Sequence, residues 1–114
     1  MDETIKQADQ RLAEAFRSLG YILSEAGGVI DGTAVYDKQG RYVFAWHRNP
    51  RHLLFYLRRP ALDIKSTLRQ KAISRHGAGN TKENSGRETT IILNSEADAQ
   101  TLLAWLMPTL PLPG

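Results

Sequence analysis

The chain has 114 residues, of which 41% are hydrophobic and 24% are charged, and it contains no cysteine. This length and composition suit one globular domain, and they exclude a disulfide scaffold, a thiolate metal site and a cysteine nucleophile. The chain starts with Met1-Asp2-Glu3 rather than the basic residues of a secretory signal, and no apolar run approaches the roughly 20 residues of a membrane span. We therefore expect a cytoplasmic protein that does not bind membranes.

The charge is unevenly distributed along the chain. Residues 1–40 contain four basic and seven acidic residues, residues 41–87 contain eleven basic and two acidic residues, and residues 88–114 contain three acidic residues and no Lys or Arg. A middle segment of net charge +9 therefore lies between two flanks of −3 each. Such segregation indicates an anionic partner, and it is the main functional signal in the sequence.

Apolar residues at helical spacing predict a helix at 4–19, and Gly20 suits the left-handed conformation that ends a helix. A short extended piece at 21–23 and a break at Gly27-Gly28 follow. Three strands are then predicted, joined by short turns, at 29–36, 41–47 and 52–59. This arrangement is typical of an antiparallel meander.

Two more helices and one more strand complete the pattern. Pro60 suits the first turn of a helix, which is predicted at 61–76. Residues 77–86 have the composition of a loop, and 89–93 is predicted as a short strand. Ser95 is expected to cap the last helix, because its side chain can accept a hydrogen bond from a free backbone N–H.

The order α-β-β-β-α-β-α predicts an α+β fold with a single antiparallel sheet of about four strands. We expect helices on one face of this sheet, with the other face either open or covered only by the N-terminal helix. The expected domain spans residues 1–107, and a proline-rich tail follows at 108–114.

The basic residues of the middle segment, 41–87, lie at turns, at the end of the third strand and along the helix that follows, so we expect them to form one basic strip. Nucleic-acid-binding proteins combine such cations with aromatic side chains. Here, however, alternation places Tyr42, Phe44 and Trp46 on one strand face, so we expect the aromatic residues to serve the core. Lys65 and Arg69, one helical turn apart, are expected to share a face. The predicted phosphate contacts are Arg48, Arg51, Arg58, Arg59, Lys65, Arg69, Arg75 and Lys82.

The leading hypothesis is a non-enzymatic domain that binds nucleic acid, either DNA or RNA, through these residues and without a cofactor. An alternative is a protein-interaction adaptor or inhibitor whose basic surface binds an acidic partner protein. An exposed sheet edge or face would also allow a homodimer. An enzyme is the least supported hypothesis, because no nucleophile has a base at a recognisable spacing.

The three histidines are expected to be structural. His47 and His52 lie at either end of a predicted turn, and two imidazoles facing each other could hold a metal ion, but no third ligand is nearby. We therefore expect polar hairpin residues and no metal site. His76 lies at a predicted helix end, where a positive charge is favourable.

Four stretches resemble small α+β domains of the YjbR and YdhG kind. They are Gly40–Trp46, Arg51–Leu57, Thr89–Leu93 and the apolar run that includes Leu102, Leu103, Trp105 and Leu106. Together they cover roughly residues 27–107 and follow the order of a glycine turn, two strands, a helix, a strand and a closing helix. The resemblance implies an α+β fold, suggests a DNA-binding role and supplies no catalytic residues.

Overall fold

The computed structural model describes residues 1–25 and 31–114. In this part of the chain six strands form one antiparallel sheet in the order β1-β2-β3-β4-β6-β5. The strands are β1 (Ile22–Glu25), β2 (Gly32–Tyr36), β3 (Tyr42–Arg48), β4 (Leu53–Leu57), β5 (Thr81–Glu83) and β6 (Thr89–Leu93). The α-helices are α1 (Glu3–Ser18), α2 (Arg59–Ile64), α3 (Thr67–His76) and α4 (Glu96–Leu106), and two 3₁₀ turns are η1 (Ala78–Asn80) and η2 (Met107–Thr109).

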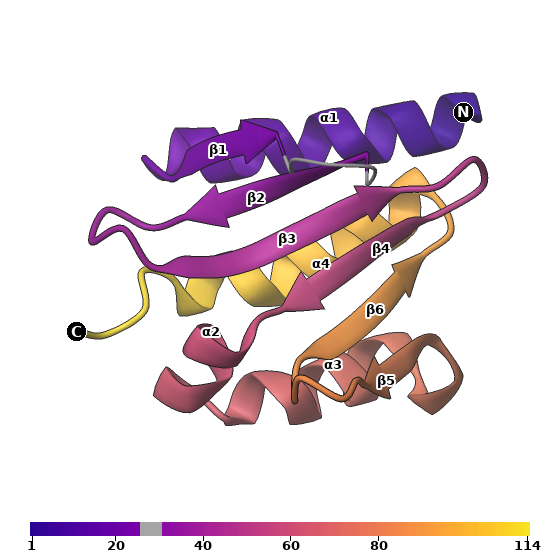
Figure 1. The fold of residues 1–114 in the computed structure, drawn as a ribbon. Coiled ribbons are helices and arrows are strands. Elements are labelled where there is room, and N and C mark those ends of the chain that lie inside the picture. The colour runs from indigo at the N-terminus through magenta and orange to yellow at the C-terminus, as the bar shows by residue number, and fades with distance from the viewer. Residues whose placement is uncertain (26–30) are drawn as a thin grey trace.

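The helices gather on one side of the sheet. Figure 1 shows α1 and α4 running behind the strands and α3 at the lower end near β5 and β6, and no helix of the described residues crosses the front of the sheet. α3 also contacts α4. The predicted α+β class with a single antiparallel sheet is confirmed. No helix of the described residues is long and apolar enough to cross a membrane.

The predicted number of strands, about four, is too low. The extended piece expected at 21–23 becomes the edge strand β1, and part of the expected loop at 77–86 becomes the edge strand β5. Each edge strand pairs with one neighbour only, β1 with β2 and β5 with β6. Short edge strands carry few buried side chains, so they leave a weak hydrophobic pattern in a sequence. The predicted Gly27-Gly28 break lies outside the described residues.

The helix predicted at 61–76 is broken into two. α2 ends at Ile64, and Lys65 then leaves the helical conformation, with φ −140° and ψ 82°. The break lets α2 bury Ala61 and Leu62 while α3, in a new direction, buries Leu68 and Ala72. Lys65 and Arg69 therefore do not share a helix face as predicted.

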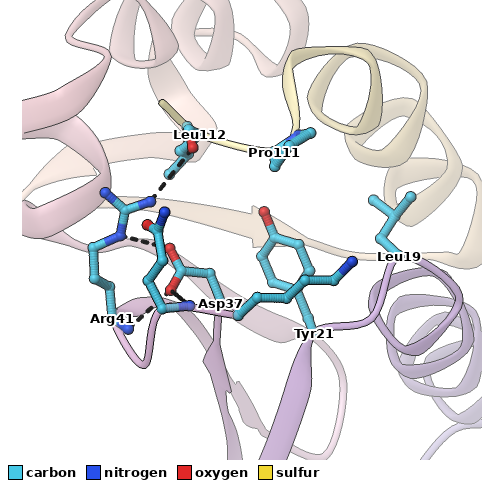
Figure 2. Close-up of a pocket in the computed structure, with 8 residues that line it drawn as sticks. Leu19, Tyr21, Asp37, Arg41, Pro111 and Leu112 are labelled. Carbon is cyan, nitrogen blue, oxygen red and sulfur yellow. Dashed lines mark hydrogen bonds and ion pairs between the residues drawn. The ribbon is translucent and has the colours of Figure 1, made fainter. Parts of the chain in front are cut away.

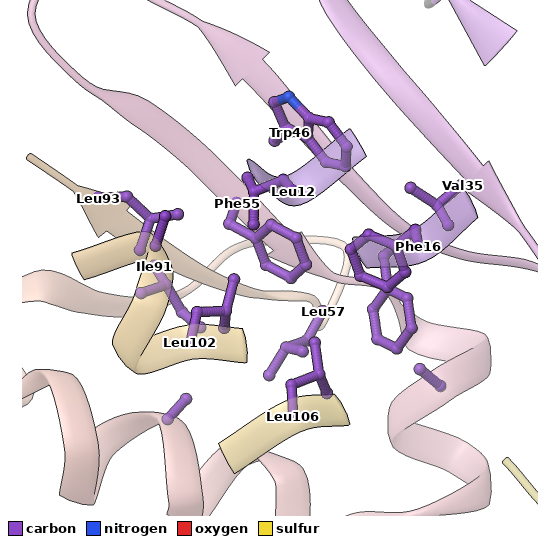
Figure 3. Packing of buried hydrophobic residues seen from close by; sticks show 14 of the residues in the cluster. Leu12, Phe16, Val35, Trp46, Phe55, Leu57, Ile91, Leu93, Leu102 and Leu106 are labelled. Atoms are coloured by element: carbon purple, nitrogen blue, oxygen red, sulfur yellow. The ribbon is translucent and has the colours of Figure 1, made fainter. Parts of the chain in front are cut away.

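The core fills the space between the sheet and the helices. The Phe16 ring of α1 lies 5.4, 6.1 and 6.3 Å from the rings of Phe44, Trp46 and Phe55. In the other half, Leu102 of α4 lies next to Ile91 of β6 and Leu106 of α4 lies next to Leu57 of β4, with Leu93 in the same cluster (Figure 3). Each of these side chains is fully buried, which contributes about 1.5–3 kcal/mol per residue.

A β-bulge in β3 changes which aromatic residues reach this core. Tyr36 pairs with Tyr42, but the preceding residue Val35 pairs with Phe44, so Val43 is the extra residue on its strand. Val43 and Phe44 are both buried in the core, and Tyr42 contacts Tyr36 instead. The prediction that Tyr42 shares the face of Phe44 and Trp46 is therefore wrong, because simple alternation does not hold across a bulge.

The proline-rich segment 108–114 packs against the domain. Leu112 is buried and belongs to the core cluster. The Arg41 guanidinium donates hydrogen bonds to the carbonyls of Leu112 and Pro113. These contacts fix the segment beside the turn between β2 and β3.

Candidate nucleic-acid interface

The face of the sheet opposite the helices, here called the open face, is set by the strand register. Leu53, Phe55 and Leu57 point into the core, so Leu54 and Tyr56 of the same strand point away from it. Side chains opposite each other on neighbouring strands share a face. The residues that the register assigns to the open face are Ile22, Ser24, Gly32, Ala34, Tyr36, Tyr42, Ala45, His47, Leu54, Tyr56, Lys82, Thr90 and Ile92.

Two pairs of half-exposed aromatic side chains lie on the open face, one beside the turn between β2 and β3 and one toward the other end of β3. The rings of Tyr36 and Tyr42 lie 5.0 Å apart, and the guanidinium of Arg58 lies 3.7 Å from the centre of the Tyr42 ring. The rings of His47 and Tyr56 lie 4.7 Å apart, with 3.3 Å between the Tyr56 hydroxyl and His47 Nδ1. The open face thus presents two aromatic pairs and one stacked cation.

Burial shifts the pKa values of His47, Tyr42 and Tyr56. It lowers the pKa of His47, while the charge of Glu88 opposes this shift. It also raises the pKa of Tyr42 and of Tyr56. His47 and both tyrosines are therefore neutral at neutral pH, and the open face presents uncharged rings that can stack on other planar groups.

A shallow hollow of about 330 Å³ continues the open face toward β5. The side chains of Leu54, Thr90 and Ile92 form its floor, and Asn80 and Lys82 stand at its rim. This floor has no charged group, so a flat apolar ligand can lie on it while its charged part reaches Lys82.

Arg48, one of the predicted phosphate contacts, is enclosed in an acidic network. Its side chain is 11% exposed and forms ion pairs with Asp9 at 3.1 Å, Glu25 at 2.7 Å and Asp31 at 2.8 Å. It also donates hydrogen bonds to Thr33 Oγ1 and to the carbonyl of Gly32. Burial alone would lower the pKa of Arg48, but the hydrogen bonds to Asp31 and Asp9 raise it. Arg48 joins α1 to β2 and β3.

Arg58 and Arg69 are also engaged within the chain. Arg58 forms an ion pair with Glu88 at 2.9 Å and donates to the carbonyl of Tyr42. Arg69 donates to Thr89 Oγ1 and lies 3.4 Å from Glu83. These two guanidinium groups are partly exposed, so each has an acidic partner that an incoming phosphate would have to displace.

The other five predicted contacts lie in separate places. Arg51 is exposed in the turn between β3 and β4, and Lys82 is exposed on β5 at the edge of the open face. Arg59 and Lys65 follow the far end of β4, where Arg59 is 3.8 Å from Asp63. Arg75 lies in a groove between α3 and α4, on the helical side of the domain. The basic residues therefore surround the domain instead of forming one strip.

The three histidines lie apart and contact different partners. Among the described residues no group of three His, Asp or Glu side chains could hold a metal ion. His47 contacts Tyr56, and His52 contacts Asn49. Burial lowers the pKa of His76, which accepts a hydrogen bond from the Trp105 indole at 2.9 Å. At neutral pH His76 is thus a neutral acceptor and not a cation at a helix end.

The sequence did not assign the open face. The sequence predicts Tyr36 and Thr90 only as parts of strands, because the face of Tyr36 depends on the register of β2 with β3 and that of Thr90 on the long-range pairing of β4 with β6. Strand alternation alone assigns Tyr56 to the face opposite Phe55, whereas Tyr42 can be placed only when the bulge in β3 is known. No family model, curated protein or solved structure matches the chain, so the resemblance to YjbR-like domains stays a prediction.

Proposed function

We propose that this protein is a non-enzymatic nucleic-acid-binding domain that holds a single strand on the open face of its sheet. The observation that supports the proposal most strongly is the pair of aromatic clusters, Tyr36 with Tyr42 and His47 with Tyr56, on a sheet face that no helix of the described residues covers. Aromatic side chains on such a face offer stacking platforms for unpaired bases, each contributing about 1–3 kcal/mol.

The basic residues that border the open face supply the phosphate contacts. Arg51 and Lys82 are exposed at two of its edges and have no ion-pair partner among residues 1–25 and 31–114. Arg59 and Lys65 extend this border beyond the end of β4. Arg48 acts as a structural residue, and Arg75 lies away from the interface, so the phosphate contacts are a subset of those expected from sequence.

A single strand suits this surface better than a duplex. Bases of a duplex are stacked inside the helix and cannot reach the rings of a sheet, whereas unpaired bases can lie flat on them. The hollow at Leu54, Thr90 and Ile92 has space for one such base beside Lys82. The stacked Arg58 adds a cation at the opposite end of the face.

The proposal is tested by fluorescence anisotropy with labelled single-stranded DNA, single-stranded RNA and duplex DNA at low salt. The single strands are expected to bind more tightly than the duplex. Tyr56→Leu and Tyr42→Leu should each weaken binding roughly tenfold, since each removes a stacking ring. Tyr56→Phe is the matched control, because it keeps the ring and should keep binding. Absence of binding to all three probes would contradict the proposal.

Charge reversal separates the border of the open face from the rest of the basic surface. The double variant Arg51→Glu with Lys82→Glu should weaken binding and flatten its salt dependence, because fewer counterions are released. The double variant Arg17→Glu with Arg75→Glu changes the net charge equally, on exposed helix positions. It should retain most of the affinity. Equal losses in both variants would place the interface elsewhere.

A protein partner is the second candidate for the open face. Ile22 on the edge strand β1 is 62% exposed, and the register assigns it to the same face as the tyrosines. Apolar exposure at a sheet edge is a feature of protein-binding surfaces. Co-purification of a protein that survives nuclease treatment, and is lost in Ile22→Lys, would favour this candidate.

A further inference from the structure

A second hollow lies away from the open face, where the end of α1, the turn between β2 and β3 and the C-terminal segment meet (Figure 2). Its volume is about 270 Å³, which is below the roughly 300–1,000 Å³ of pockets for drug-sized ligands. Leu19, Pro111 and Leu112 give it apolar walls. The size and the walls suit a small organic molecule.

The end of α1 places Tyr21 in this hollow. The N–H of Gly20 donates to the carbonyl of Arg17 and the N–H of Tyr21 donates to that of Phe16, which together form a Schellman motif. Gly20 has φ +84°, the left-handed conformation predicted from sequence. The Tyr21 ring packs 5.6 Å from Phe16, so its hydroxyl points between Pro111 and Leu112 (Figure 2).

The hydroxyl of Tyr21 is buried without a hydrogen-bond partner in the described part of the chain. Tyr21 is 6% exposed. Burial raises the pKa of its hydroxyl, as does the charge of Asp37, while Arg41 and the backbone N–H of Leu112 oppose the shift without giving the hydroxyl a well-aligned partner. A buried donor of this kind favours a ligand that brings an acceptor.

The nearby acceptor Asp37 is already satisfied. Its Oδ1 accepts from the backbone N–H groups of Gln39 at 3.0 Å and Arg41 at 2.9 Å, and its Oδ2 accepts from Arg41 Nε at 2.6 Å. Burial alone would raise the pKa of Asp37, but these hydrogen bonds outweigh it and lower the pKa. Asp37 therefore stays charged and paired with Arg41.

Lys38 supplies the free cation of the hollow. It is exposed, and the structure gives it no ion pair with any described residue. Its side chain crosses the backbone of Gly20, where a Cβ atom would come within 2.5 Å of Lys38 Cε. Glycine at position 20 thus permits both the helix end and the close approach of the lysine, which brings the ammonium group beside Leu19 and Tyr21.

We infer that this hollow binds a small organic monocarboxylate with an aromatic or branched aliphatic body. Among the described residues that line the hollow, the buried unpaired group is the Tyr21 hydroxyl and the cation without an ion pair is the Lys38 ammonium. Both are donors, so they favour a ligand that offers acceptors and a negative charge. The apolar body packs against Leu112 and Pro111. The charge of Asp37 disfavours a dianion such as a phosphate monoester, since only one cation is free to balance it.

The inference is independent of the proposed function, because none of the lining residues lies on the open face. It is tested by titrating the intact protein with benzoate, followed by methyl NMR of Leu19 and Leu112. Benzamide serves as the neutral analogue of the same shape, and benzylamine as a cationic analogue of similar size. We expect benzoate to shift both leucine signals in a saturable way, benzamide to bind more weakly and benzylamine not to bind.

Three variants complete the experiment. Tyr21→Phe and Lys38→Met should each weaken benzoate binding roughly tenfold, while Lys71→Met, an exposed lysine of α3, should leave it unchanged. Tyr21→Phe should also leave the free protein at least as stable as the wild type, because it removes an unpaired buried hydroxyl. The inference is overturned if benzoate causes no shift, if benzamide binds equally well, or if Tyr21→Phe binds benzoate like the wild type.

Discussion

The arginines of the basic middle segment differ in their environment and in their role. Arg48 is 11% exposed and bonded to three carboxylates, whereas Arg51, three residues later, is exposed in a turn. The sequence shows the two as equivalent cations around Pro50. Only the pairing of β2 with β3, which brings Asp31 and Thr33 beside Arg48, separates a structural arginine from one available to a ligand.

Arg48→Met is therefore expected to destabilise the protein by about 2 kcal/mol. This is less than the ~3–5 kcal/mol for a fully buried pair, because Glu25 and Asp31 are mostly solvated while Asp9 is not. Urea denaturation measures the change. Arg51→Met is the control and should shift the midpoint little, and an equally small shift in Arg48→Met would show that the network is not stabilising.

His76 makes the stability depend on pH. Its pKa in the folded protein is lowered below 6.5 by burial, with Asp98 opposing, so below that value the unfolded chain binds more protons. Stability is then fully present above pH 6.5 and is lost as the pH falls below it. Protonation also removes the acceptor for the Trp105 indole.

Comparison of the wild type with His76→Gln isolates this effect. Glutamine keeps an acceptor for Trp105 and does not titrate. His47 also has a lowered pKa, so both proteins should lose some stability between pH 7.5 and 5.5. The wild type should lose more, measured as the fall in urea midpoint. Parallel falls in the two proteins would contradict the role given to His76.

Elements with strong local sequence signals were predicted, whereas features that depend on long-range pairing were not. α1 and α4 form close to the expected positions, because each combines an apolar stripe with a clear end signal, Gly20 for α1 and Ser95 for α4. The break at Lys65, the bulge at Val43 and the strand β5 were missed. The break, the bulge and the edge strand each depend on how their segment packs against other segments of the fold.

The N-cap of α4 can be tested by mutation. The side chain of Ser95 accepts a hydrogen bond from the N–H of Asp98 at 3.2 Å. Ser95→Ala should therefore cost about 1 kcal/mol of folding free energy, measured by thermal or urea unfolding. Ser74→Ala, on the exposed side of α3, should be neutral or slightly stabilising, since alanine favours a helix. A neutral Ser95→Ala would mean that the cap contributes nothing.

For the whole molecule, the fold corrects the picture of one basic strip. The basic residues of 41–87 were expected to form one strip. In the fold, Arg51 and Lys82 lie beside the open face, whereas Arg75 lies on the helical side. The sheet also places Tyr36, which lies outside the basic segment, next to Tyr42. The functional surface proposed here thus combines aromatic residues from β2, β3 and β4 with cations at its border.

The most direct test of this account is NMR mapping of a short single-stranded oligonucleotide on the labelled protein. We expect the largest changes at Tyr36, Tyr42, His47 and Tyr56, with smaller changes at Arg51 and Lys82. The groove between α3 and α4, which contains Arg75, should be unaffected. Changes confined to that groove, or no saturable change on the open face, would contradict the account.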